Sequence, residues 1–375
     1  MNYWVDNYLI CIVISVLLAG LLIPKILLIA FRKSLFDEID ERKIHRGVVP
    51  RLGGIAFIPA MIFSFCLVVG VNWRLSMPQM THELGSSIVP IFFMICALML
   101  MYLVGIADDL IGVRYRAKFI FQILAGCLVV VSGLWVKDLY GFCGIWEWPT
   151  ILGWAFTILL VIYITNAINL IDGIDGLASG LSAIALAFYS YVFYSSGEYI
   201  YMLLSGSMLG TLLPFFYFNV FGSADRHTKI FMGDTGALTV GLVLSFMVIA
   251  VFNIPISSQP NGENTFILAL APILLPCLDV ARVFFHRVKR KKNPFLPDKC
   301  HIHHKFLALG FKQYQALLFI LGMDAVFIGC NLWLSGWLQS TWLLLGDFVV
   351  WIIINIFLTY MIRQRERATG EILYE

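Results

Sequence analysis

Apolar segments of about 20 residues recur along the whole chain, and this recurrence constrains the fold more than any other feature. A helix of that length crosses the hydrocarbon core of a bilayer and satisfies its own backbone hydrogen bonds there. We therefore predict an all-α, polytopic integral membrane protein with about eleven spans. The spans are expected near residues 8–31, 52–71, 87–106, 118–136, 149–168, 176–195, 200–221, 236–255, 264–285, 316–337 and 340–362.

The composition excludes several classes of protein. Of the 375 residues, 60% are hydrophobic and 13% are charged, whereas a soluble domain carries roughly a quarter charged residues. A water-soluble enzyme, a disordered chain and a DNA-binding module do not fit this composition, so no nucleic-acid partner is expected. The first span is too long for a signal peptide, and Asp6 rather than a basic cluster precedes it. We expect residues 1–375 to form a single domain embedded in the lipid bilayer.

Basic residues fall on one set of connections between the spans. Five segments hold 22 of the 26 Lys and Arg residues, namely 32–51, 107–118, 222–235, 286–315 and the tail after residue 362. Positive residues mark cytoplasmic connections, so the N-terminus is predicted outside and the C-terminus inside. The long polar connections lie in the same set, which places any chemistry on the cytoplasmic face. The segments expected to carry it are about 32–51, 107–118, 169–176, 222–236 and 286–315.

Two of these segments combine charge with a helix end. Residues 40–47 read DERKIHRG and lead to the pair Gly53-Gly54, so basic groups adjoin a helix entrance suited to a phosphate. Positive-inside anchoring followed by a turn is the alternative. Asp108 and Asp109 end the third span, where adjacent carboxylates favour a bound cation or a shared proton. A solvated helix end is the alternative there.

Two further segments place carboxylates beside glycines. Residues 166–176 read NAINLIDGIDG, and their four polar residues recur every three positions, a pattern that an apolar span does not require. Residues 231–236 read FMGDTG, so glycines flank Asp234 and allow a metal or phosphate to approach the backbone closely. A capped helix end for the first segment and an N-cap aspartate for the second are the alternatives.

The longest cytoplasmic connection contains three histidines in four residues, His301, His303 and His304, within PDKCHIHH at 297–304. They suit hydrogen bonding to a pyrophosphate or a sugar. A zinc site is less favoured, because no second Cys/His set with the required spacing recurs. Structural or surface histidines are the third interpretation. Asp279, Asp324 and Asp347 lie within spans, and no partner for the last two is evident from the sequence.

Together these segments favour phosphoryl transfer. Carboxylate oxygens suit Mg²⁺ or Mn²⁺, and a divalent cation with basic residues neutralises the charge that develops on a transferred phosphoryl group. A site at the membrane surface points to a lipid phosphate as one substrate and a nucleoside-diphosphate compound as the other.

The segments resemble, in order, those of the polyprenyl-phosphate N-acetylhexosamine-1-phosphate transferases, which form glycosyltransferase family 4. The resemblance extends from about residue 8 to residue 362 and rests on residues 41–54, Asp108-Asp109 with Lys118, and residues 166–176, 231–236 and 297–304. The H-I-H-H sequence is closer to the WecA/TagO branch, which starts O-antigen, common-antigen or teichoic-acid chains, than to the related MraY branch.

The resemblance implies transfer of GlcNAc-1-phosphate from UDP-GlcNAc to undecaprenyl phosphate. The reaction would release UMP and initiate cell-envelope polysaccharide synthesis at the cytoplasmic face of the bacterial inner membrane. Leu296 and Lys299 depart from residues common in the branch, next to the expected sugar loop, so another UDP-N-acetylhexosamine (GalNAc, FucNAc, QuiNAc or MurNAc-pentapeptide) stays open. Monomer and homodimer stay open as well.

The resemblance also implies residue roles. Asp234 would be the principal Mg²⁺ ligand, with Asp172 nearby or sharing that role in catalysis. Asp108 would orient the lipid phosphate or accept its proton, supported by Asp109. The nucleotide and sugar would be bound by Asn169, Asp175, His301, His303 and His304, and phosphates by Lys43, His45 and Lys118.

Two other classes of function remain in view. A transporter or flippase for a lipid-linked or phosphorylated solute would need polar residues at mid-membrane and access from both faces, whereas this sequence concentrates its carboxylates and histidines on one face. An inactive scaffold would not require the acidic segments.

Overall fold

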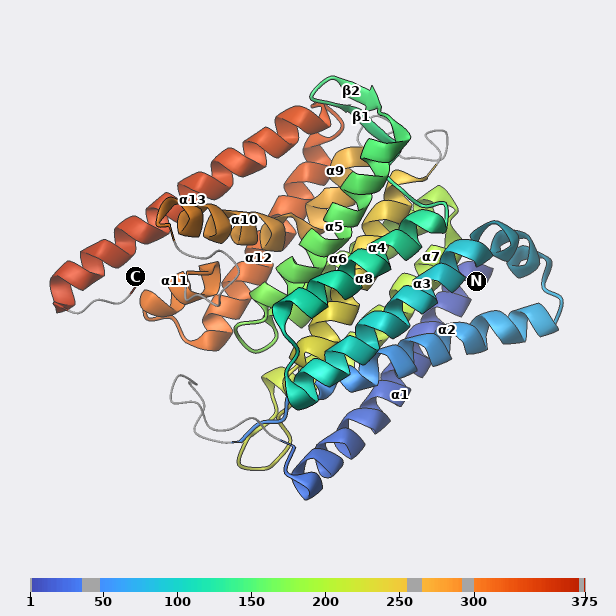
Figure 1. The fold of residues 1–375 in the computed structure, drawn as a ribbon, viewed down its shortest axis with the longest axis horizontal. Helices are drawn as coiled ribbons and strands as arrows, with labels where there is room; N and C mark the ends of the chain where they lie inside the picture. The colour runs from blue at the N-terminus through green and yellow to red at the C-terminus, as the bar shows by residue number, and fades with distance from the viewer. Residues whose placement is uncertain (1, 36–47, 255–264, 292–299, 371–373, 375) are drawn as a thin grey trace.

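The computed structural model describes an α-helical bundle with one short β-hairpin (Figure 1). Ten helical segments in the described part of the chain are long and apolar enough to cross a membrane. The prediction of an all-α polytopic membrane protein is therefore confirmed. The described residues are 2–35, 48–254, 265–291, 300–370 and 374.

The helices follow one another along the chain with short connections. They are α1 (Tyr3–Lys33), η1 (Gly53–Ala56), α2 (Phe57–Arg74), α3 (Pro78–Ile111), α4 (Tyr115–Val131), α5 (Thr150–Ile171), α6 (Leu177–Ser196), α7 (Tyr199–Val220), α8 (Gly233–Phe252), α9 (Thr265–Leu270), η4 (Ala271–Ile273), α10 (Leu274–Lys289), α11 (Ile302–Ala308), α12 (Gln313–Leu334) and α13 (Ser340–Thr369).

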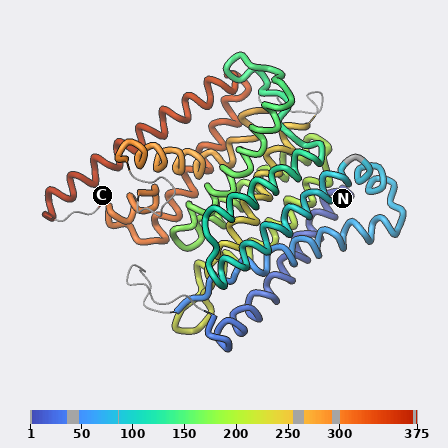
Figure 2. Tube along the Cα trace, in the orientation of Figure 1, coloured from blue at the N-terminus to red at the C-terminus, as the bar shows by residue number. Residues whose placement is uncertain are grey.

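The segment that accounts for the difference between eleven predicted spans and ten long helices is α4. It contains 17 residues, which is the lower limit for a helix that crosses a bilayer. It packs against α3 and α5 and runs between their ends (Figure 2). Counted as a crossing, α4 leaves the N- and C-termini at opposite ends of the bundle, as Figure 2 draws them.

Helix α8 lies at the centre of the bundle. All of its residues from Thr235 to Phe252 are buried, and it contacts α3, α5, α6 and α7. Because lipid chains are as apolar as leucine, membrane helices associate through close packing of small residues. Gly241 follows this rule: a Cβ there would lie 2.7 Å from Cα of Thr165 on α5. The chain entering α8 is therefore held in a crowded, well-packed position.

The predicted span 264–285 is not one continuous helix. It is broken at η4, around Pro272, and the chain continues as α10, which diverges from the bundle toward α13 in Figure 1. Proline removes a backbone donor and clashes with the preceding turn, which explains the break. The break directs the second half, α10, and Asp279 on it, toward the cytoplasmic histidine segment.

The intramembrane carboxylates divide in a way that the sequence did not indicate. Asp347 was expected to lack a partner, but its carboxylate accepts a 2.8 Å hydrogen bond from Asn331 of the neighbouring helix α12. Asp324 is fully buried, and neither of its carboxylate oxygens has a hydrogen-bond partner among the described residues.

A short hairpin, β1 (Asp138–Phe142) and β2 (Ile145–Glu147), departs from the purely helical expectation. Gly141 and Gly144 both have positive φ angles, which glycine adopts without strain, and they allow the tight reversal. The hairpin lies at the end of the bundle opposite the C-terminus (Figure 1).

The contact between α3 and α8 predicts opposite effects for two glycines of the same helix. A Cβ at Gly105 would collide with the backbone of Thr235, whereas a Cβ at Gly85 would meet nothing within 4 Å. Gly105→Ala should therefore lower the thermal stability of the detergent-solubilised protein, by about 1–3 kcal/mol in unfolding free energy. Gly85→Ala should be neutral or stabilising by up to about 1 kcal/mol, because alanine favours a helix. Equal melting temperatures for the two variants would contradict this packing.

Candidate functional site

The start of α8 is fixed by a single carboxylate from α3. Asp109 accepts a hydrogen bond from the backbone N–H of Asp234 at 2.7 Å, and two from Thr235, from its N–H at 2.9 Å and its hydroxyl at 2.5 Å. The first N–H groups of a helix have no partner within the helix and carry a partial positive charge, so a carboxylate is favourable there. Asp109 thereby sets the position of its neighbour in space, Asp234.

A second contact holds the same segment from the other side. The backbone N–H groups of Gly53 and Gly54 donate to the carbonyls of Phe231 and Met232, at 3.0 and 2.9 Å. A Cβ at Gly54 would collide with the backbone of Gly236, so only glycine permits this approach. The predicted Gly53-Gly54 entrance and the FMGDTG segment are thus adjacent, although 178 positions separate Gly54 from Met232 in the sequence.

Lys118 connects two of the predicted catalytic carboxylates. Its ammonium group forms an ion pair with Asp108 Oδ2 and another with Asp234 Oδ1, the latter at 3.0 Å. The amide of Asn169 donates to the same Asp234 oxygen at 2.9 Å. The side chains of Lys118 and Asp234 are 22% and 26% exposed, so the pair is accessible from the polar end of the bundle. The structure therefore brings together residues from α3, α4, α5 and α8.

The NAINLIDGIDG segment serves several purposes at once. Asn166 exchanges hydrogen bonds with Gln122 of α4 and so links two helices, away from the carboxylates. Asn169 faces Asp234, as described above. Asp175 forms a 2.6 Å ion pair with Lys229, in the connection that leads into α8. Beyond it, the N–H of Gly176 donates to Asn219 at 2.6 Å, which ties the segment to the end of α7.

Asp172 ends α5 and is half-buried. Burial of its carboxyl group raises the pKa to about 7, and the charges of Asp175, Asp234 and Asp109 add to the increase, while Arg51 opposes it. Like charges this close disfavour ionisation of all of them at once. The site therefore carries surplus negative charge, which a bound cation would relieve.

The histidine segment is anchored by Asp279 of α10. The fully buried Asp279 carboxylate lies 2.8 Å from Nδ1 of His301 and accepts from the backbone N–H of Ile302 at 3.1 Å. Arg282 donates to Asp279 at 2.8 Å and also to the carbonyl of Cys300. A carboxylate on Nδ1 fixes the orientation of an imidazole ring and directs its other nitrogen away. Asp279 and Arg282 therefore position the segment that begins at His301.

His303 brings the histidine segment against the carboxylate segment. A Cβ at Gly173 would collide with the His303 ring, so the ring lies directly on the Gly173 backbone. His303 is 1% exposed, and neither ring nitrogen has a hydrogen-bond partner among the described residues. Burial and the nearby His304 and His301 lower the pKa of His303 well below its usual value. A neutral ring with two available nitrogens suits hydrogen bonding to a polar ligand.

Some predicted site residues lie outside the described part of the chain, namely Lys43 and His45 and the residues 297–299 before the histidines. Sequence reasoning did not identify Thr235, Lys229 and Arg282 as partners of the site carboxylates. It noted that Asp279 lies roughly two turns from its helix end, a spacing that matches its contact with His301.

The donor set fits a divalent cation shared with a substrate better than a protein cage. No group of three or more His, Cys, Asp or Glu residues with metal-binding geometry occurs among the described residues. Mg²⁺ is commonly held by one or two carboxylates together with water and substrate phosphates, so it does not require such a group. Asp234, Asp172 and the amide oxygen of Asn169 are oxygen donors of the kind that Mg²⁺ prefers.

Comparison with known proteins agrees with this arrangement. Residues 91–252 match the model of glycosyl transferase family 4. The chain belongs to glycosyl transferase family 4. The matched residues include the carboxylates of α3, α5 and α8 and end at the last residue of α8, whereas the histidine segment lies outside them.

Curated relatives cover most of the chain. One is the undecaprenyl-phosphate alpha-N-acetylglucosaminyl 1-phosphate transferase of Yersinia pestis, 29% identical over 78% of this chain and 74% of the relative. Another is the probable undecaprenyl-phosphate N-acetylglucosaminyl 1-phosphate transferase of Bacillus subtilis, 29% identical over 86% of each chain. The Escherichia coli K12 protein with the same name as the Yersinia relative is 28% identical over 78% of this chain.

The contact between Gly173 and His303 predicts a coupled pair. Gly173→Ala should lower the melting temperature because the added methyl group displaces the buried imidazole, at a cost of about 1–3 kcal/mol. In a His303→Ala background the same substitution should cost little, since the ring is gone. Thermal unfolding of the wild type, both single variants and the double variant measures this coupling. Additive effects would contradict the contact between the two segments.

Proposed function

We propose that this member of glycosyl transferase family 4 transfers N-acetylglucosamine-1-phosphate from UDP-GlcNAc to undecaprenyl phosphate. An oxygen of the lipid phosphate bonds to the β-phosphorus of the nucleotide sugar while the bond from that phosphorus to the oxygen of UMP breaks. The products are undecaprenyl-diphospho-N-acetylglucosamine and UMP. The names of the curated relatives support the reaction, and the ion pairs of Lys118 with Asp108 and Asp234 are the observation that carries it.

The lipid phosphate is assigned to Lys118 and Asp108. Lys118 supplies positive charge, and its present partners show that it reaches both carboxylates. Asp108 takes up the proton when the lipid phosphate arrives as a monoanion, and then remains paired with Lys118. Asp109 is assigned a positioning role, because both of its oxygens are occupied by the start of α8. Direct attack is preferred over an aspartyl-phosphate route, since two phosphates held together by cations need no covalent intermediate.

The nucleotide sugar is assigned to the opposite side of the carboxylates. His303 and His301 offer ring nitrogens to the pyrophosphate and sugar, with His304 beside them. Asn169 and Asp175 complete this side, next to the nucleotide phosphates or nucleoside. Lys43 and His45 remain proposed phosphate ligands from the cytoplasmic connection 32–51.

Asp234 and Asp172 are the proposed ligands of Mg²⁺, with Mn²⁺ as a substitute. When bound, the cation neutralises charge on the pyrophosphate and on the leaving UMP. The elevated pKa of Asp172, about 7, means that a proton competes with the cation below that pH. The Mg²⁺ concentration for half-maximal rate should therefore rise as the pH falls below about 7.

We place the site at the cytoplasmic face of the bacterial inner membrane. The connections that carry it hold 22 of the 26 Lys and Arg residues and lie at the end of the bundle opposite the hairpin (Figure 2). The account extends to the initiation of a cell-envelope polysaccharide, because the lipid-linked sugar is the starting unit of such polymers.

The proposal predicts lipid-dependent release of UMP. Purified protein in detergent, given Mg²⁺, undecaprenyl phosphate and UDP-GlcNAc, should release UMP only when the lipid is present. Asp234→Asn should lower this turnover about 100-fold or more, because a proposed metal ligand is lost. EDTA should abolish turnover and added Mg²⁺ or Mn²⁺ should restore it.

Asp225→Asn is the matched control, since Asp225 is an exposed carboxylate in the connection leading to α8. It should leave turnover unchanged. Release of UDP would indicate simple glycosyl transfer, and UMP released without lipid would indicate a covalent route. A better donor among other UDP-N-acetylhexosamines would change the sugar but keep the chemistry. No nucleotide from any donor would refute the proposal and favour a transporter.

A further inference from the structure

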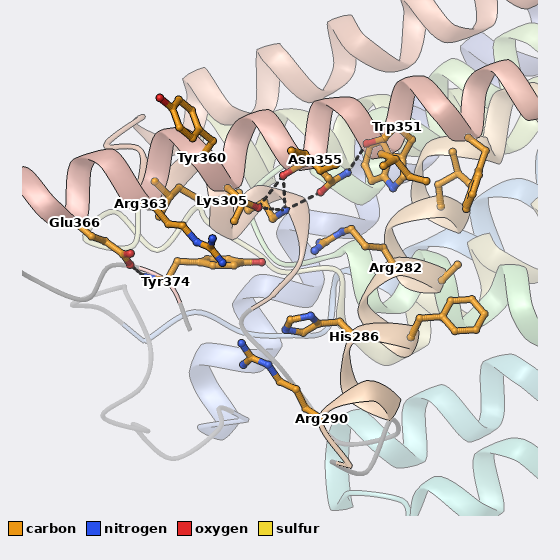
Figure 3. Close-up of a pocket in the computed structure, with 18 residues that line it drawn as sticks. Arg282, His286, Arg290, Lys305, Trp351, Asn355, Tyr360, Arg363, Glu366 and Tyr374 are labelled. Atoms are coloured by element: carbon orange, nitrogen blue, oxygen red, sulfur yellow. Dashed lines mark hydrogen bonds between the residues drawn. The ribbon is translucent and has the colours of Figure 1, made fainter.

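A lateral cavity of about 860 Å³ lies between α10 and α13, on the far side of α10 from the carboxylates (Figure 3). Both helices belong to segments that are long and apolar enough to cross the membrane. The cavity is therefore bounded by membrane helices rather than by soluble loops. Its chemistry differs from one end to the other.

The cytoplasmic end of the cavity is basic. Five of its lining residues can carry positive charge and one, Glu366, is acidic. Figure 3 shows these basic side chains converging from α10, α11 and α13 on one space. Lys305 is held there by Asn355 and Thr359 of α13, at 2.9 and 3.0 Å. The basic residues are Arg282, His286, Arg290, Lys305 and Arg363.

The other end of the cavity is apolar and opens sideways. Phe285 on α10 and Ile352 and Ile356 on α13 line it, and their side chains are 69%, 40% and 64% exposed. In a membrane-spanning segment such exposure faces lipid chains. A ligand that fits both ends has an anionic head at the interface and an apolar tail that reaches into the bilayer.

Two polar groups inside the cavity point to a ligand independently of charge. Trp351 is 2% exposed and lines the cavity, yet its indole N–H has no hydrogen-bond partner among the described residues. The Nε–H of Arg282 is likewise without a partner in that part of the chain. Buried donors normally find an acceptor, so an acceptor-rich group fits this position.

We propose that the cavity binds an anionic membrane phospholipid, with its phosphate among Arg282, Arg290 and Arg363 and an acyl chain along Phe285 and Ile352. Basic pockets between membrane helices on the cytoplasmic side recognise such headgroups. The site is separate from that of the lipid substrate, because Asp279 and the histidine segment lie between the cavity and the carboxylates.

The bound phosphate would contact a residue that already holds the histidine segment. Arg282 donates to Asp279 and to the carbonyl of Cys300, and both partners adjoin His301. Tyr374 lines the cavity and donates to the same Cys300 carbonyl at 2.7 Å. An anionic headgroup at Arg282 therefore stabilises the side chain that positions His301.

Native mass spectrometry of the delipidated full-length protein, titrated with phosphatidylglycerol, tests the proposal. The double variant Arg290→Gln/Arg363→Gln removes two charges at the cavity and should weaken phosphatidylglycerol binding about tenfold or more. The control Lys289→Gln/Arg367→Gln removes two exposed charges from the same two helices, outside the cavity, and should bind as the wild type does. Phosphatidylcholine should bind about tenfold more weakly than phosphatidylglycerol to the wild type.

Each other outcome overturns the assignment. Equal binding by the cavity variant and the control variant would show that the cavity is not the site. Displacement of phosphatidylglycerol by undecaprenyl phosphate at lower concentration would assign the cavity to the lipid substrate. Displacement by inorganic phosphate would indicate an anion site without a lipid tail. Matching melting temperatures of the two double variants exclude unfolding as the cause of any loss.

Discussion

The site depends on one carboxylate that never needs to touch a substrate. Asp109 of α3 binds the first N–H groups of α8, the buried central helix, and so fixes where Asp234 lies. Hydrogen bonds to a charged group contribute about 1.5–3 kcal/mol each, and the partial positive charge of the helix end adds to them. The absence of side chains at Gly54 and Gly105 lets η1 and α3 approach α8 closely enough for these bonds to form. Asp108, one residue earlier, is left to pair with Lys118.

Segments far apart in the sequence build the remainder of the site in two halves. One half is the carboxylate group around Lys118, held by helices α3, α4, α5 and α8. The other is the histidine segment, which Asp279 on the displaced helix α10 positions through His301. The two halves meet where the ring of His303 lies on the backbone of Gly173. The break at Pro272 is what allows α10 to reach the histidines, so a fault in one membrane helix serves the assembly of the site.

The sequence was sufficient for the helical membrane fold and for the segments that form the site, because span length and the distribution of charge are local properties. It also separated the carboxylates of residues 108–109, 172–175 and 234 from the apolar background. It could not assign different tasks to Asp108 and Asp109, since these depend on which neighbour each oxygen meets. The partner of Asp347, the break in the ninth span and the anchoring of His301 by Asp279 are tertiary contacts, and no periodicity encodes them.

The most direct test of this account compares two adjacent substitutions, Asp108→Asn and Asp109→Asn, by thermal unfolding and by lipid-dependent UMP release. Asp109→Asn should lower the melting temperature and turnover together, because an amide cannot accept all three hydrogen bonds from the start of α8. Asp108→Asn should keep the melting temperature near that of the wild type while turnover is lost. Equal melting temperatures for the two variants, or a destabilised Asp108→Asn protein that retains turnover, would contradict the division of tasks between these neighbours.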